Sequence, residues 1–384
     1  MAKHEKKRNP LLRLITFIVT AVLLLTALAL VVFRDSWNMD ALVRTLRYYN
    51  IERNDNGAAV PFEHGGKDTD IYTLLDGNLL FCSPNYLQLY SQSGTSYIDQ
   101  SIAFQRPVIR TAGRYAIVFD VGGKEYFLIS GRELIYQGTI EGNRSIISAN
   151  VCSNGQYAIV STERGYKGVV NLYRSAGDLA ATWGVSSEFV ADCALMNNGN
   201  TLVILSIGQD GSSFRSTLKY HTMGVEEPFA AVELLNNVVL DLKVQGDTLW
   251  ALGENQVSAY SASAALLGSY DYTNGYLKQY SLSGDGYATL LIGVYRAGSM
   301  GNLVMVSATG EVLGMESISE QVLTLSSAGR YTALLTYDKM SLFTTGFVPY
   351  GSDYSAATAQ RALMRDDGSV LLLSGKSASI YLPE

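Results

Sequence analysis

A short glycine turn recurs eight times along this chain and constrains the fold more than any other feature. Each copy has a small or polar residue, a glycine, a polar residue and an apolar run, as in RTAGRYAIVFD and SSAGRYTALLT. The turn glycines are Gly77, Gly113, Gly155, Gly199, Gly246, Gly284, Gly329 and Gly368, which are 36 to 47 residues apart. Short apolar runs bounded by Gly, Asn, Asp and Ser indicate β-strands. A period of about 42 residues is typical of a four-stranded propeller blade.

A second repeat follows each glycine turn at a regular distance. It is an apolar strand that ends in an aromatic or apolar residue and a turn, as in LQLYSQSG, VNLYRSAG and LVMVSATG, and a further short strand follows it. Each unit therefore has strands A to D in order. We predict an all-β, eight-bladed β-propeller, with seven blades as the alternative if the short first unit is not a full blade. A pair of β-sandwiches would not explain the constant period.

The two ends of the repeat region complement each other. The eighth unit stops at Glu384 after strands A, B and C, while a spare strand, AAVPF at residues 58–62, precedes the first unit. Pairing of these segments would leave no bare edge, and Pro61 is tolerated on an outer strand. We therefore predict a propeller over residues 58–384 that is closed by residues 58–62.

The N-terminal region has the pattern of a membrane anchor. Residues 14–33 are twenty uncharged residues, which as a helix span roughly 30 Å. Five basic residues and only Glu5 as an acid precede them, and positive flanks stay in the cytoplasm. We expect a basic cytoplasmic tail at 1–13, a single plasma-membrane helix at 14–33 and an extracytoplasmic propeller. A cleaved signal peptide is the alternative, but the apolar run continues past the small-x-small site at Ala27–Ala29.

Residues 34–57 are predicted to form a juxtamembrane helix and a linker. Met39, Leu42, Val43, Leu46 and Tyr49 fall on one helical face. Two roles remain open at this point. The helix either lies at the membrane interface or docks a partner, with Trp37 at the headgroups, or it is a spacer that packs on the propeller.

Composition and motifs exclude several functional classes. With 29 basic and 35 acidic residues, the chain is not a typical nucleic-acid binder. Three scattered histidines argue against a His-based metal site, and HExxH, GxSxG and GxGxxG motifs do not occur. We therefore expect no catalytic residues, no metal and no cofactor. Cys82, Cys152 and Cys193 lie in strand segments and are expected to be buried and inert.

The predicted topology places A–B and C–D turns on one face of the propeller and B–C and D–A loops on the other. The A–B turns repeat, whereas the B–C loops vary in length and carry charge, and variable loops on a rigid scaffold are the usual place for binding. The candidate binding residues are Asp120, Lys124, Glu163, Arg164, Tyr166, Tyr295, Arg296, Asp338 and Lys339.

The segment NLVMVSATGEVL and the turn pattern resemble the blades of WD40-like and quinoprotein-like propellers. The tryptophan that ends each quinoprotein repeat is missing; only Trp183 is near such a place. As a whole, the chain resembles a bacterial family catalogued as domain of unknown function 5711. The resemblance rests on the basic N-terminus, the apolar segment, LVRTLRYYN, the Val-Pro-Phe strand and the GRYA-type turns. It implies an extracytoplasmic propeller of Gram-positive bacteria and no catalytic residues.

Two functional hypotheses follow. The first is a membrane-tethered, non-catalytic recognition or scaffold module that binds a protein or a cell-wall polymer outside the cell. The alternative is an extracytoplasmic enzyme of quinoprotein or hydrolase type with a site in the central channel. The missing catalytic motifs favour the first.

Overall fold

The computed structural model describes residues 16–24, 44, 48, 61–211 and 213–383, which fall into two units, Met1–Asn50 and Ile51–Glu384. In the first unit, residues 16–24 are helical, and Thr20 Oγ1 donates to the Thr16 carbonyl. No helix among the described residues is long and apolar enough to cross a membrane. The predicted tail at 1–13, residues 14, 15 and 25–33 of the predicted membrane helix, and most of the predicted segment 34–57 lie outside the described residues.

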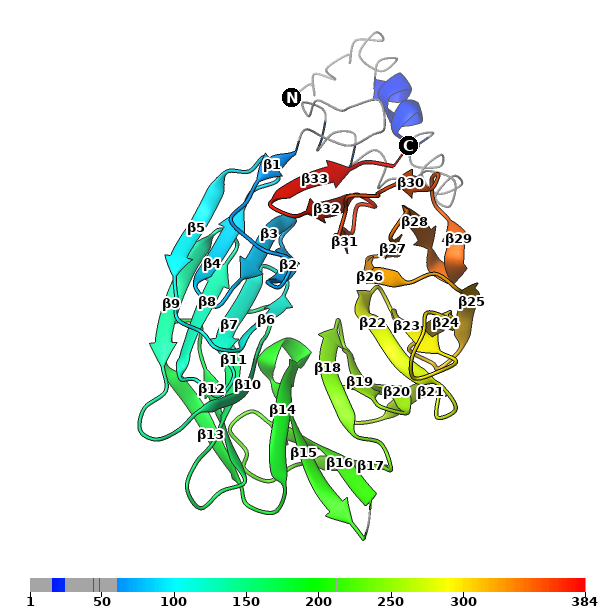
Figure 1. Cartoon of the computed structure of the whole chain (residues 1–384). Helices are drawn as coiled ribbons and strands as arrows, with labels where there is room; N and C mark the ends of the chain where they lie inside the picture. The colour runs from blue at the N-terminus through cyan, green and yellow to red at the C-terminus, as the bar shows by residue number, and fades with distance from the viewer. Residues whose placement is uncertain (1–15, 25–43, 45–47, 49–60, 212, 384) are drawn as a thin grey trace, which may run out of the picture. The chain divides into compact units, whose positions relative to one another are not determined.

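The second unit is an all-β, eight-bladed propeller, as predicted: eight antiparallel sheets surround a central opening (Figure 1). Strands A to D of blades 1 to 4 are β2–β5 (Ile71–Leu75, Asn78–Cys82, Tyr86–Tyr90, Ser96–Ser101), β6–β9 (Pro107–Ala112, Tyr115–Asp120, Glu125–Ser130, Glu133–Thr139), β10–β13 (Ile146–Val151, Tyr157–Ser161, Gly168–Tyr173, Leu179–Val185) and β14–β17 (Phe189–Met196, Thr201–Asp210, Ser213–Thr222, Ala230–Leu235).

The remaining blades follow the same order. Blades 5 to 8 are β18–β21 (Val239–Gln245, Thr248–Gly253, Gln256–Ser261, Leu266–Asp271), β22–β25 (Tyr276–Gly284, Tyr287–Gly293, Gly301–Ser307, Val312–Ile318), β26–β30 (Val322–Ala328, Tyr331–Thr336, Lys339–Thr344, Val348–Pro349, Tyr354–Ser355) and β31–β33 (Arg361–Met364, Val370–Ser374, Ser377–Tyr381) with β1 (Phe62–Glu63). Strand A is the inner strand of each blade. In blade 7, two short strands, β29 and β30, share the outer position beside β28.

The ring is closed by β1, which pairs with β33 so that Phe62 lies opposite Ala378 and Glu63 opposite Ser377. The backbone N–H of His64 adds a bond to the Lys376 carbonyl at 2.8 Å. The sequence placed the closing strand at 58–62. The described strand is at 62–63, Pro61 precedes it, and residues 58–60 lie outside the described residues.

The repeated glycines serve the A–B turns because these turns need a left-handed backbone. Gly113 has a φ of 56° and Gly329 a φ of 54°, values that residues with a Cβ rarely adopt. In blade 6, the turn glycine is Gly286, with a φ of 75°, while Gly284 is the last residue of β22.

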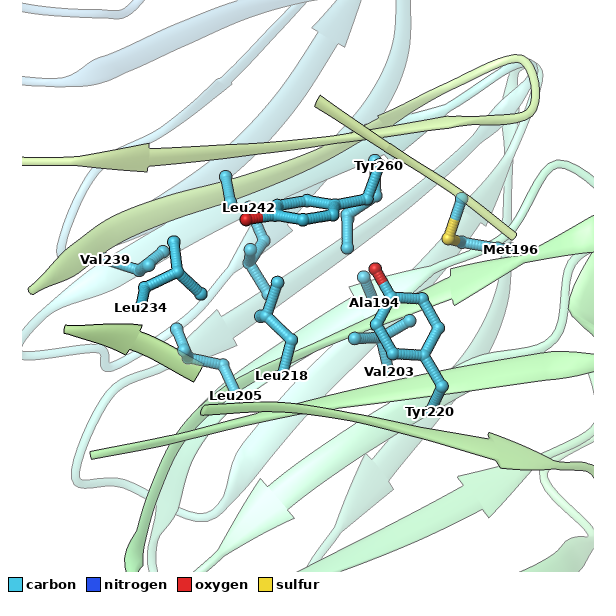
Figure 2. Close-up of a cluster of buried hydrophobic side chains, with 12 residues drawn as sticks. Ala194, Met196, Val203, Leu205, Leu218, Tyr220, Leu234, Val239, Leu242 and Tyr260 are labelled. Atoms are coloured by element: carbon cyan, nitrogen blue, oxygen red, sulfur yellow. The ribbon is translucent and has the colours of Figure 1, made fainter. Parts of the chain in front are cut away.

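Hydrophobic cores lie between neighbouring blades, where side chains of adjacent sheets interdigitate. Figure 2 shows the core between blades 4 and 5, which includes Leu205, Leu218 and Tyr220 from one blade and Leu242 and Tyr260 from the other. Tyrosines that repeat at the same register pack in these cores, and several of their hydroxyls are bonded inside: Tyr287 donates to the Tyr331 carbonyl at 3.0 Å.

The three cysteines are free and buried. Burial raises the pKa of the Cys82 thiol to about 12 and that of Cys193 well above its ordinary value. High thiol pKa values disfavour the thiolate, which is the nucleophilic form. Both residues are therefore structural.

Candidate functional site

The two faces of the propeller differ in what connects the strands. The loop face, as we call it, carries the B–C and D–A connections and the strand ends that adjoin them. The turn face carries the A–B and C–D turns. In an antiparallel sheet of four sequential strands, these connections must lie at opposite ends of the strands.

Blade 3 supplies three of the predicted binding residues, all on its B–C connection. Glu163 forms an ion pair with Arg144, with Oε2 3.1 Å from Nε, so its carboxylate is partly engaged. Arg164 is exposed. Tyr166 is 51% exposed, and its ring lies over Gly184, where any Cβ would clash with it. The glycine thus lets a large aromatic ring rest on the neighbouring strand and face solvent.

Blades 6 and 7 supply the predicted pairs on the other side of the loop face. Tyr295 is 63% exposed, and Arg296 beside it is exposed. Asp338 is exposed on the B–C connection of blade 7. Lys339 is bound to Asp353 at 2.8 Å, and both side chains are about half exposed. These residues lie on the predicted face.

The two predicted residues of blade 2 differ from each other. Lys124 is exposed, and its Nζ donates to the Gly142 carbonyl at 2.7 Å. Asp120 is only 7% exposed, and its Oδ1 accepts bonds from the backbone N–H groups of Gln105 and Arg106 at 3.0 and 2.7 Å. Asp120 therefore holds the D–A loop in place and does not belong to a binding surface.

The predicted residues share a face but are spread over blades 2, 3, 6 and 7, so they do not form one cluster. The sequence analysis named two of the exposed large apolar residues of this face, Tyr166 and Tyr295, and missed the others. Among the described residues, the exposed large apolar side chains of the loop face are Tyr86, Tyr166, Phe189, Phe214, Leu235, Leu240, Tyr276, Val294, Tyr295, Met300 and Tyr337. Seven of these residues are aromatic. Among the exposed large apolar residues described on the turn face, Phe229 is the aromatic one.

Blade 4 carries two of these exposed aromatic residues on one sheet. Its strands β15 and β16 are ten residues each, longer than those of the other blades, and the hairpin projects at the bottom of Figure 1. Phe189 and Phe214 are 62% and 61% exposed, and their register places them on the same face of this sheet. We call Phe189 and Phe214 the blade-4 patch.

An ion network on the opposite side of the same sheet fixes the hairpin. Glu188 is 2.8 Å from Arg215 and 3.5 Å from Lys219, and Ser206 Oγ donates to its other oxygen at 2.8 Å. Partial burial opposes ionisation of Glu188, but Arg215, Ser206 and Lys219 outweigh it and hold its pKa below the ordinary value. The carboxylate therefore stays charged and keeps the protruding strands rigid.

The central channel contains a second group of charged residues, which the sequence analysis did not find. Arg110 of blade 2 lies 2.7 Å from Asp241 of blade 5 and 3.7 Å from Asp192 of blade 4. Ser148 of blade 3 donates to Asp192 at 2.6 Å, and Tyr280 of blade 6 donates to Asp241 at 3.1 Å. Burial raises the pKa of Asp192, while Arg110 and Ser148 oppose the rise. Five blades are thus joined across the channel.

A signal for this network was present in the sequence. Five inner strands carry a β-bulge at the same register, and a polar residue follows each bulge: Ser148, Asp192, Asp241, Gln279 and Thr324. Each of these side chains makes a polar contact with another blade. Bulges re-aim side chains, which explains why polar groups leave the apolar pattern here.

The comparisons with known proteins bear on family and fold. A family model described as a family of unknown function (DUF5711) matches residues 58–346. No curated protein matches the sequence.

The solved structures that resemble this chain are propellers of varied kinds. BamB from Moraxella catarrhalis is 12% identical, with a TM-score of 0.52 and 84% of this chain and 96% of that chain covered. The C-terminal WD40 domain of Sif2 is 11% identical, with a TM-score of 0.56 and coverage of 83% and 98%. The dihydro-heme d1 dehydrogenase NirN is 12% identical, with a TM-score of 0.51 and coverage of 76% and 66%. At such low identity, these similarities show the fold alone.

Proposed function

Because the chain belongs to the DUF5711 family, whose function is unknown, we propose a role from its own surface: a non-catalytic scaffold that binds a protein partner through the loop face. The observation that carries the proposal is the set of seven exposed aromatic side chains on this face, two of which form the blade-4 patch. Aromatic residues and arginine are enriched among the residues that dominate binding energies at protein interfaces.

Rigidity supports the same proposal. Phe189 and Phe214 stand on a sheet whose strands are held by Glu188, Arg215 and Lys219, and Lys167 Nζ covers one side of the Phe189 ring at 4.1 Å. A side chain that is already positioned loses little conformational entropy on binding. Exposed rings on rigid strands therefore suit recognition of a protein.

The test is a double variant, Phe189→Ser with Phe214→Ser. Both rings are mostly in solvent, so the melting temperature should change little, while a protein that co-purifies with the wild-type chain after crosslinking should be lost. The matched control is Leu179→Ser with Leu266→Ser, two residues of the turn face with 56% and 58% exposure. A partner that survives the first variant and is lost in the control would refute the proposal.

The proposal includes a tether: residues 14–33 cross the plasma membrane once, with the N-terminus in the cytoplasm. A cysteine introduced in place of Ser36 should react with an impermeant thiol reagent on intact cells, and one in place of Ala2 should not. The three native cysteines are buried, so the background is low. Labelling at position 2 alone would reverse the proposed topology.

A further inference from the structure

The mouth of the channel on the turn face is hollowed on both sides of Lys243. A cavity of about 290 Å³ lies among blades 2, 3, 4 and 5, and a second of about 440 Å³ extends toward blades 1, 6, 7 and 8. Lys243 and residues 111–113 line both. Lys243 Nζ reaches across the ring and donates to the Thr111 carbonyl at 3.1 Å. This hydrogen bond separates the two cavities.

Lys243 differs from the other channel cation in how its charge is balanced. It holds the same register position on β18 as Arg110 on β6, two residues before the last paired residue of strand A. Arg110 has two aspartates as partners. Among the described residues, no carboxylate oxygen lies within 4 Å of Lys243 Nζ to form an ion pair with it. Its ammonium has three donors, and the Thr111 carbonyl takes one.

Burial and the nearby charge of Arg110 lower the pKa of Lys243, and Asp241 opposes the shift. In such surroundings, the charged form of a lysine is destabilised unless an anion binds beside it. The natural partner for such a group is a ligand that carries negative charge.

The smaller cavity is suited to that ligand. Its lining contains no Asp or Glu, and Lys243 is its charged residue; Ser153, Asn197 and Asn198 add polar groups at the rim. Asn197 and Asn198 both have a left-handed backbone, with φ of 49° and 50°. Two consecutive residues in this conformation carry strain, which tends to be retained at ligand-binding and functional sites.

We propose that the cavity among blades 2 to 5 binds a small organic monocarboxylate, with Lys243 as the anchor of the carboxylate group. A single negative charge fits better than the two of a phosphate. Arg110 is already paired, and Asp192 and Asp241 behind it would repel a second charge. The volume fits a molecule of up to about the size of an acylated amino acid. This site lies on the turn face and does not depend on the proposed role of the loop face.

The experiment is reductive methylation of the full-length protein with formaldehyde and dimethylamine–borane as the hydride donor, with the rate at each lysine measured by mass spectrometry. We expect Lys243 to react, because the cavity admits small molecules and a lowered pKa increases the reactive amine. Acetate and N-acetylglycine should slow its reaction at least fivefold with saturation, relative to chloride at equal ionic strength. Exposed Lys339 should not respond.

Three outcomes would overturn the proposal. They are an unreactive Lys243, a reaction that neither carboxylate slows more than chloride does, and protection by inorganic phosphate alone. A second measurement uses Lys243→Met, which keeps the side-chain length and removes the charge. Carboxylates should raise the melting temperature of the wild type and of Lys339→Met but not of Lys243→Met. Should Lys243→Met fail to fold, the labelling of the wild type decides.

Discussion

Arg110 and Asp241 pair across the channel with side chains 27% and 12% exposed, whereas Lys339 and Asp353 pair on the loop face with 44% and 52% exposed. The residue types and distances are similar, but the surroundings differ. A pair shielded from water has a large effect on stability when one partner is removed, while an exposed pair contributes little. Charges in the channel therefore hold blades together, whereas exposed ion pairs on the loop face contribute little to stability.

The largest expected effect comes from breaking the channel pair. Arg110→Ala leaves Asp192 and Asp241 facing each other without a cation, and we expect a loss of about 3 kcal/mol in the free energy of unfolding. Urea unfolding of the full-length protein measures it. Lys339→Ala is the control and should cost less than about 1 kcal/mol. Equal effects for the two variants would remove the distinction between the regions.

A second variant sharpens this result. Arg110→Ala combined with Asp241→Ala should be more stable than Arg110→Ala alone, because it removes one of the two carboxylates that the single variant leaves unpaired. Together with Asp241→Ala alone, these variants form a double-mutant cycle. Strictly additive changes in the free energy of unfolding would mean that the two side chains are not coupled.

The next effect concerns Lys243 and is smaller. Its folded-state pKa is depressed, so its charged form reduces stability at neutral pH, and stability is recovered as pH rises through the folded pKa toward the unfolded value. In ligand-free buffer, Lys243→Met should therefore melt slightly above the wild type at pH 7, and the difference should shrink near pH 10. Paired melting curves at the two pH values measure this. A lower melting temperature for Lys243→Met at pH 7 would mean that the ammonium stabilises the fold.

The smallest effect on stability is expected on the loop face. Arg164→Ala, Arg296→Ala and Lys339→Ala together should cost no more than about 1 kcal/mol, because all three residues lie at the surface. The same variant should bind the crosslinked partner more weakly. Unchanged stability together with unchanged partner binding would leave the apolar residues as the sole determinants of recognition.

The fold was predictable because its repeats are local. Each A–B turn needs a left-handed residue, so glycine marks every blade, and the missing strand D of the eighth unit indicates how the ring closes. The bounds of the closing strand were not predictable, because β1 is two residues, too short to have a periodicity.

The candidate site was only partly predictable. Arg164 and Tyr295 lie exposed on the face that the variable, charged loops indicated, but Asp120, which has the same appearance in the sequence, is buried by its bonds to backbone N–H groups. The exposed residues Phe189 and Phe214 were not predicted, because the sequence does not show that the hairpin of blade 4 extends beyond its neighbours.

The channel network was only partly predictable, for a different reason. Arg110 and Asp241 are more than a hundred residues apart in the chain and meet only because the ring brings blades 2 and 5 across from each other. The equivalent positions of Asp192 and Asp241 after their bulges were a usable signal. This pattern does not show which polar residues meet, because the distances across the channel are set only when the ring closes.

The central claim is that partners bind the loop face, and site-specific photocrosslinking in cells tests it most directly. A photoreactive amino acid replaces Phe214 in one full-length protein and Asp247, an exposed residue of the turn face, in another. We predict a discrete crosslinked protein from position 214 and none from position 247. A crosslinked protein from position 247 with none from position 214 would contradict the account.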